Sequence, residues 1–139
     1  MDEDRLKHSY AVAIKMTEYG EKRGYSAEQI HELFLLGFNH DIGYQYGKSE
    51  NHGEVGAEIL KRSGYKYWQE VYYHGKANSL YSSEYLDILN AADMSIDKYG
   101  NDVGVEKRLE DIKCRHGIDS VPYTNCEKLV KELKDKGVL

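Results

Sequence analysis

Apolar residues recur along this chain at spacings of three, four and seven, the pattern of helices that bury one face. Alternating patterns of the strand type are nearly absent. Glycine-containing polar segments separate the helical stretches, whose predicted bounds are Asp4–Tyr19, Ser26–His40, Asn51–Leu60, Tyr67–His74, Ser83–Tyr99, Val105–Arg115 and a last helix that begins at Thr124. The sequence therefore predicts an all-α fold, a compact helical bundle.

Residues at the borders of these stretches predict where helices begin and end. A short polar side chain can accept a hydrogen bond from a free N–H group of the first turn. Gly20 and Gly24 are predicted to bracket the exit of the first helix. The predicted caps are Ser26 with Gln29, Asn51 with Glu54, and Thr124 with Glu127.

Length and composition indicate a simple domain organisation. A chain of 139 residues is expected to form a single domain, residues 1–139, and to need no disulfide, because it buries about 70% of its extended-chain surface. The only proline is Pro122, and neither a linker nor a repeat is visible.

Charge and cysteine content limit which kinds of partner and which cellular compartment we expect for this protein. A net charge of -5 and a pI near 5.7 argue against binding of long nucleic acid. Cys114 and Cys126 lack the spacing of a metal or redox motif and are predicted to be reduced thiols. No stretch resembles a signal-peptide core or a membrane span, so we expect a cytoplasmic protein without membrane contact.

Four histidines and two aspartates lie where metal ligands could converge. Neighbouring side chains on a helix point about 100° apart, so two adjacent ligands reach one point only over the helix end. His40 and Asp41 are such neighbours, at the end of an apolar run. Most of the others project from apolar helix faces, at spacings of three, four or seven from apolar residues. The full set is His8, His40, Asp41, His52, His74 and Asp93.

A single histidine on an apolar face is usually a satisfied core residue. His31 and His116 lie among charged residues and are predicted to be surface groups. The combined set is different, because two buried carboxylates without partners would cost several kcal/mol each. Histidine nitrogen and carboxylate oxygen suit iron, manganese, zinc, cobalt and nickel ions, and the sequence does not select among them.

The order of these residues resembles the HD-domain superfamily of metal-dependent phosphohydrolases. The stretch from His52 to Ala57 is most similar to the bacterial branch that splits dinucleoside tetraphosphates symmetrically. Two positions depart from the pattern: Tyr44 stands where many members have lysine, and Gly75 where that branch often has threonine. The segments that carry the resemblance are Arg5–Val12, Phe38–Gly43, His52–Ala57, Tyr73–His74 and Ala91–Asp93.

The resemblance implies a single HD domain, with metal-binding helices in about 5–99 and C-terminal helices in about 105–137. It implies one shared divalent ion, held by His8, His40, Asp41 and Asp93. It also implies that Asp41 bridges to a second ion on His52 and His74. Members of the superfamily hydrolyse phosphate esters or anhydrides through metal-bound hydroxide, so a nucleotide or other small phosphorylated substrate is expected here, with Asp41 as the catalytic residue. Candidate phosphate contacts are Arg5, Lys48 and Lys76.

Other functions remain open from sequence alone. The domain could be a non-catalytic module that senses a nucleotide or a partner, a di-iron oxygenase, or a helical interaction domain whose histidines are incidental. Exposed tyrosines, among the 13 in the chain, could support a homodimer. The first expectation is a phosphohydrolase that binds one or two divalent ions.

Overall fold

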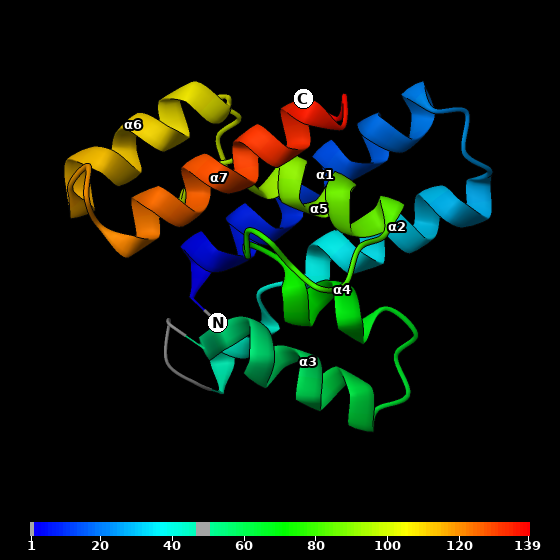
Figure 1. The fold of residues 1–139 in the computed structure, drawn as a ribbon. Coiled ribbons are helices and arrows are strands. Elements are labelled where there is room, and N and C mark those ends of the chain that lie inside the picture. The colour runs from blue at the N-terminus through cyan, green and yellow to red at the C-terminus, as the bar shows by residue number, and fades with distance from the viewer. Residues whose placement is uncertain (1, 47–50) are drawn as a thin grey trace.

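The computed structural model describes residues 2–46 and 51–139, and this part of the chain is all-α (Figure 1). Its only strand-like pairing is an isolated bridge between Ile96 and Asp102. The predicted all-α class is therefore confirmed. No helix in the described ranges combines the length and apolarity that crossing a bilayer requires. The elements are α1 (Glu3–Lys22), α2 (Ala27–Asn39), the 3-10 turn η1 (Ile42–Gln45), α3 (His52–Arg62), α4 (Trp68–Tyr73), α5 (Glu84–Asp93), α6 (Val105–His116) and α7 (Val121–Asp135).

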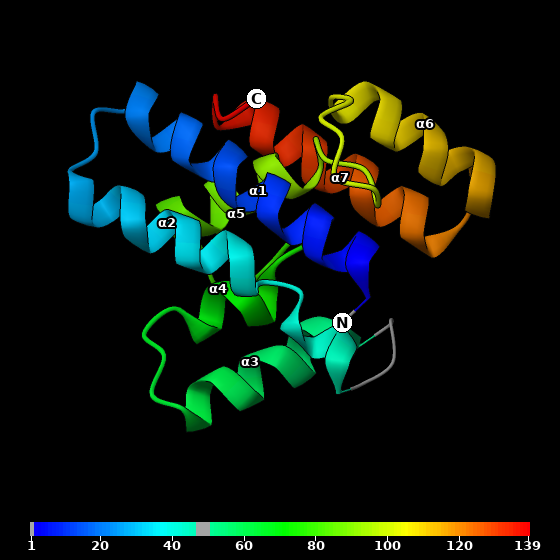
Figure 2. The ribbon, with the colours of Figure 1, turned by 180° about the vertical axis from the view of Figure 1, so that it is seen from behind.

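Helix α5 lies at the centre of the arrangement. Helices α6 and α7 pack on one side of it, and α3 and α4 lie on the other, next to the α1–α2 pair (Figures 1 and 2). Leu89 and Ala92 of α5 belong to the core shared with α1–α4, whereas Ala91 and Met94 belong to the core shared with α6 and α7. The second half of α5 is buried against both cores, and it thereby carries the last residue of the helix, Asp93, into the interior.

Helices α1 and α2 approach closely because glycines lie between them. A Cβ added at Gly37 would lie 2.7 Å from the Ala13 Cα, and one at Gly20 would lie 2.6 Å from Leu33 Cδ1. The prediction that Gly20 and Gly24 bracket the exit of the first helix is confirmed, because α1 ends between them at Lys22, three residues beyond the predicted end at Tyr19. Gly24, with a φ of 73°, makes the turn.

The predicted helix caps have mixed outcomes. The capping box at Ser26 is confirmed, because Gln29 N–H donates to Ser26 Oγ at 3.1 Å and Ser26 N–H donates to Gln29 Oε1 at 2.9 Å. Asn51 occupies the N-cap position of α3 but makes no side-chain cap hydrogen bond. The cap predicted at Thr124 is wrong, since Ser120 caps α7 and Pro122 sits in its first turn, where its missing N–H is tolerated.

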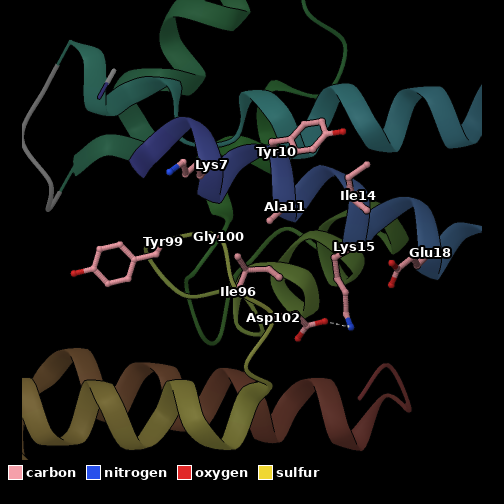
Figure 3. Close-up of a pocket in the computed structure, with 10 residues that line it drawn as sticks. All are labelled: Lys7, Tyr10, Ala11, Ile14, Lys15, Glu18, Ile96, Tyr99, Gly100 and Asp102. Atoms are coloured by element: carbon pink, nitrogen blue, oxygen red, sulfur yellow. Dashed lines mark hydrogen bonds and ion pairs between the residues drawn. The ribbon is translucent and has the colours of Figure 1, made fainter. Parts of the chain in front are cut away.

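Helix α5 ends at Asp93, well before the predicted end at Tyr99. The Asp97 carboxylate accepts hydrogen bonds from the N–H groups of Tyr99 and Asn101, both at 2.9 Å. Such local side-chain bonds offer the backbone an alternative to helix. The resulting loop lies against α1, and the two enclose a groove of about 430 Å³, where Lys15 donates to Asp102 at 2.7 Å (Figure 3).

We predict that Gly37→Ala lowers the free energy of unfolding by about 1–3 kcal/mol, because its methyl group would overlap the α1 backbone. Chemical denaturation monitored by circular dichroism measures the change. His31→Ala, at an exposed position of the same helix, is the control and should stay within about 0.5 kcal/mol of the unsubstituted protein. Equal stability of both variants would show that the helices do not depend on this close contact.

Candidate metal centre

The six candidate ligands come from separate elements and meet in one place. Only one of them, His8, lies in the interior of a helix, on α1. The others stand at helix ends, where the chain can turn a side chain across the end of the helix. His40 is the C-cap of α2, Asp41 precedes η1, His52 opens α3, His74 follows α4 and Asp93 closes α5. The adjacent pair His40–Asp41 thus lies over a helix end, as the geometry of neighbouring side chains requires.

One oxygen of Asp41 faces a first group of ligands. Asp41 Oδ2 lies 3.3 Å from His40 Nε2 and 3.6 Å from His8 Nε2. Asp93 closes this group, since its Oδ1 lies 2.9 Å from His8 Nε2 and 3.3 Å from His40 Nε2. Two ligand atoms each about 2.0–2.2 Å from one ion are separated by roughly 3–4 Å. The spacings in this group are compatible with a shared ion.

The other oxygen of Asp41 faces a second group. Asp41 Oδ1 lies 3.2 Å from His52 Nε2 and 3.4 Å from His74 Nε2. The two imidazole nitrogens are 3.1 Å apart. Asp41 is therefore the one residue with an oxygen in each group, and a second cation could lie between its Oδ1 and the two imidazoles.

Backbone carbonyls determine which nitrogen of three histidines carries the proton. A carbonyl oxygen can only accept, so each Nδ1 next to one must be an N–H donor. In the neutral ring, Nε2 then presents a lone pair to the carboxylates, which is the arrangement typical of metal-ligating histidine. The contacts are His8 Nδ1 to Asp97 O at 2.8 Å, His40 Nδ1 to Gly37 O at 2.6 Å and His74 Nδ1 to Val71 O at 2.5 Å.

His40 gives the clearest sign that a cation belongs here. Its side chain is fully buried, and among the described residues its Nε2 has no hydrogen-bond partner of acceptable geometry. A buried lone pair between two carboxylates is unfavourable unless a proton or a metal ion separates them. The donor set of imidazole nitrogens and carboxylate oxygens fits a divalent transition metal.

The charges of the cluster are strongly coupled. Burial opposes ionisation of His40, but the Asp41 and Asp93 carboxylates outweigh it and hold the pKa of His40 well above its usual value. Burial acts to raise the pKa of both aspartates, but the neighbouring imidazoles prevail and hold each pKa well below its usual value. Without a metal, a proton on His40 provides the positive charge that the two carboxylates need.

Glycines allow the second group to form. A Cβ at Gly43 would overlap the carbonyl oxygen of His52 and lie 2.9 Å from the Gly56 nitrogen. Backbone atoms of η1 and of the start of α3 therefore touch directly, which brings His52 to Asp41. The glycine two residues after Asp41 is needed for this close approach, not for an unusual backbone conformation.

Both ligand groups open onto a cavity of about 380 Å³, a size suited to a small molecule. On its wall, the Arg5 guanidinium lies 3.4 Å from the centre of the Tyr44 ring. Tyr44 in turn stacks on His52, with ring centres 4.2 Å apart. The larger groove beside α1 contains none of the six candidate ligands (Figure 3).

Two of the three predicted phosphate contacts line the cavity. Arg5 lines the cavity; Lys76 also lines it but donates to Glu54 at 3.0 Å. Lys48 lies outside the described residues. Three further basic residues in the lining were not anticipated from sequence, namely Lys98, Arg108 and Arg115. His31 and His116 are exposed, as predicted for surface groups.

Fold and site together define an all-α domain with a buried histidine–aspartate cluster that could hold divalent ions. The HD domain family matches residues 5–131, and the chain belongs to this family. The match extends past the segment that carries the resemblance in sequence, through α6 and most of α7. Comparisons with curated proteins and with solved structures each gave no match.

We predict that substitutions in the two ligand groups change the metal content of the protein to different extents. Asp41→Asn should weaken metal binding in both groups, by at least about 100-fold, more than loss of a supporting hydrogen bond does. His74→Ala should weaken binding in the second group and leave the first filled. Elemental analysis after equilibrium dialysis measures both, with His31→Ala as the control. Unchanged metal content in Asp41→Asn would contradict the assignment.

Metal binding is also predicted to release protons. Against the effect of burial, the Asp41 and Asp93 carboxylates hold the pKa of His40 well above its usual value, which favours a proton on Nε2 in the metal-free site, and an ion that binds there would displace this proton. Affinity should therefore fall as the pH is lowered. Calorimetry in buffers of different ionisation enthalpy counts the released protons. Binding with no proton release at pH 7 would contradict a proton shared by His40 and the two carboxylates in the metal-free site.

Proposed function

We propose that this HD-domain protein is a metal-dependent phosphohydrolase that acts on a nucleotide or another small phosphate ester or anhydride. The observation that supports it best is the unpartnered Nε2 of His40 between two carboxylates, beside a cavity that also presents Arg5. An uncharged or cationic ligand would gain little from an arginine at this position. A phosphate would contact both the arginine and any ion in the cluster.

The six proposed ligands would hold one or two cations beside the cavity, where a phosphate can reach them. His8, His40, Asp41 and Asp93 would bind one ion, and His52 and His74 would bind a second together with Asp41. Such ions polarise a phosphoryl oxygen and lower the pKa of a coordinated water. Phosphoryl transfer depends mainly on positioning and charge stabilisation, so a chain that aligns the phosphate beside this cluster supplies most of what the reaction needs.

Arg5 provides the means of holding the phosphate. Many HD-domain proteins have lysine at the position of Tyr44, and here the tyrosine ring lies under the Arg5 guanidinium instead. Stacking fixes the plane of the guanidinium while its N–H groups remain available. We propose that Arg5 takes the role of the missing lysine. Lys76 is the weaker candidate because Glu54 already pairs with it.

The finer substrate assignment rests on the resemblance. The stretch from His52 to Ala57 is similar to that of enzymes that split dinucleoside tetraphosphates. The glycines of this stretch have a packing role around Asp41, so their presence also fits other substrates. Dinucleoside tetraphosphates therefore belong in the first panel tested, beside nucleoside mono-, di- and triphosphates and p-nitrophenyl phosphate.

The test is metal-dependent phosphate release. Protein stripped with a chelator and reloaded separately with Mn²⁺, Fe²⁺, Zn²⁺, Co²⁺ or Ni²⁺ should hydrolyse at least one member of the panel. Asp41→Asn should lower kcat/KM by at least about 100-fold, because it removes the charge shared by both ligand groups.

Asp111→Asn is the matched control for this experiment, since Asp111 lies on α6 and pairs with the exposed Lys107 at 3.1 Å. It should keep full activity. Thermal stabilisation by nucleotides without phosphate release under any metal would contradict the hydrolase and favour a sensor. Oxygen consumption without phosphate release would favour an oxygenase.

A further inference from the structure

Helix α6 places two arginines on the wall of the metal-site cavity. Arg108 and Arg115 are seven residues apart, with the buried Ile112 between them. Residues at this spacing share one helix face, and both arginines line the cavity. The cavity therefore has a second cationic wall, which comes from α6, whereas Arg5 comes from α1.

Neither guanidinium has an ion-pair partner among the described residues, although α6 carries several carboxylates. Lys107 on the same helix pairs with Asp111 at 3.1 Å, and Glu106 pairs with Lys134 at 2.8 Å. The Nε of Arg108 is buried and lacks a hydrogen-bond partner. A buried unsatisfied donor on a charged group is unfavourable, so an anion that reached it would be bound strongly.

The nearby Asp97 does not provide this partner. Its Oδ1 accepts the N–H groups of Tyr99 and Asn101 at 2.9 Å, and its Oδ2 accepts the Asn101 side-chain amide at 3.4 Å. These hydrogen bonds and, more weakly, the charge of Arg108 outweigh burial and hold the pKa of Asp97 below its usual value, but no ion pair joins the two side chains. The other cations of the lining follow a different pattern. Lys76 is paired with Glu54, and Arg5 lies over Tyr44. The two α6 arginines are thus the guanidiniums of this cavity that have neither a carboxylate nor an aromatic partner in the described ranges.

The distribution of charge supports an anionic ligand. The chain as a whole has a net charge of -5, yet the cationic residues that line its cavity, Arg5, Lys76, Lys98, Arg108 and Arg115, outnumber the lining carboxylates. Those carboxylates are Asp41 and Asp93 of the cluster, and Glu54, which pairs with Lys76. A concentration of one charge in a cleft raises the local concentration of the opposite charge. The volume of about 380 Å³ leaves room for more than the single phosphate that the metal ligands and Arg5 would hold.

We propose that Arg108 and Arg115 form a second anion-binding subsite, which binds another phosphate of the substrate while the reacting phosphate lies at the histidine–aspartate cluster. This inference rests on the proposed function and narrows its substrate to molecules with two or more phosphate groups. A planar guanidinium binds phosphate through paired N–H groups. A phosphomonoester with a neutral remainder would contact the metal site and Arg5 but not the two arginines of α6.

A comparison of two substrates tests the subsite. For the metal-loaded protein, kcat/KM is measured with a nucleoside triphosphate and with p-nitrophenyl phosphate, and the ratio of the two values is the readout. Arg115→Gln and Arg108→Lys should each lower this ratio by about 10-fold or more, mainly through the KM for the triphosphate. Arg115→Gln removes a positive charge, whereas Arg108→Lys keeps the charge but removes the Nε donor and the paired N–H groups of the guanidinium. Lys113→Gln, on α6 but outside the cavity lining, should leave the ratio unchanged.

Binding without turnover separates this inference from the proposed function. If no member of the substrate panel is hydrolysed, the phosphohydrolase proposal fails, but calorimetry with inorganic triphosphate still tests the subsite. The Kd should then rise about 10-fold in Arg115→Gln and stay constant in Lys113→Gln. An unchanged Kd and ratio in both arginine variants would overturn the subsite, as would equal losses with both substrates. Arg115 is exposed, so its substitution should leave the melting temperature unchanged.

Discussion

The structure depends on one electrostatic constraint, a buried carboxylate whose two oxygens face two separate sets of imidazole nitrogens. Asp41 is 4% exposed, and a charge so far from water is stable only with opposite charge close to it. The Nδ1 atoms of His8, His40 and His74 are occupied by backbone carbonyls, which directs the Nε2 atoms of these three rings towards the carboxylates. A cation in the cluster could supply the opposite charge, and the donor set fits a divalent metal.

The scaffold holds this cluster through helix ends and close backbone contacts. Most of the ligands stand where a helix begins or stops, so small changes in helix position would move them independently. Gly37 lets α2 lie against α1, and Gly43 lets η1 touch the start of α3. The central helix α5 ends at Asp93 and places it in the cluster. Tight packing thus restrains charges that would otherwise separate to reach water.

Much of this could be predicted from sequence, because periodicity reports which face of a helix is buried. The fold class and the meeting of six ligands follow from apolar spacing and from the adjacency of His40 and Asp41. The end of α5 was predicted wrongly, since apolar spacing carries no information on the hydrogen bonds that Asp97 makes to its own loop. The role of Arg108 in the cavity depends on where α6 packs, which no local pattern contains.

The most direct test of the central claim is the position of bound metal. Crystals grown with Mn²⁺ should give an anomalous difference peak within coordination distance of Asp41 Oδ2 and the Nε2 atoms of His8 and His40. With full loading, a second peak should appear between Asp41 Oδ1 and His74. Well-diffracting crystals that contain Mn²⁺ only at surface carboxylates, with the Asp41 cluster unchanged and protonated, would contradict the account.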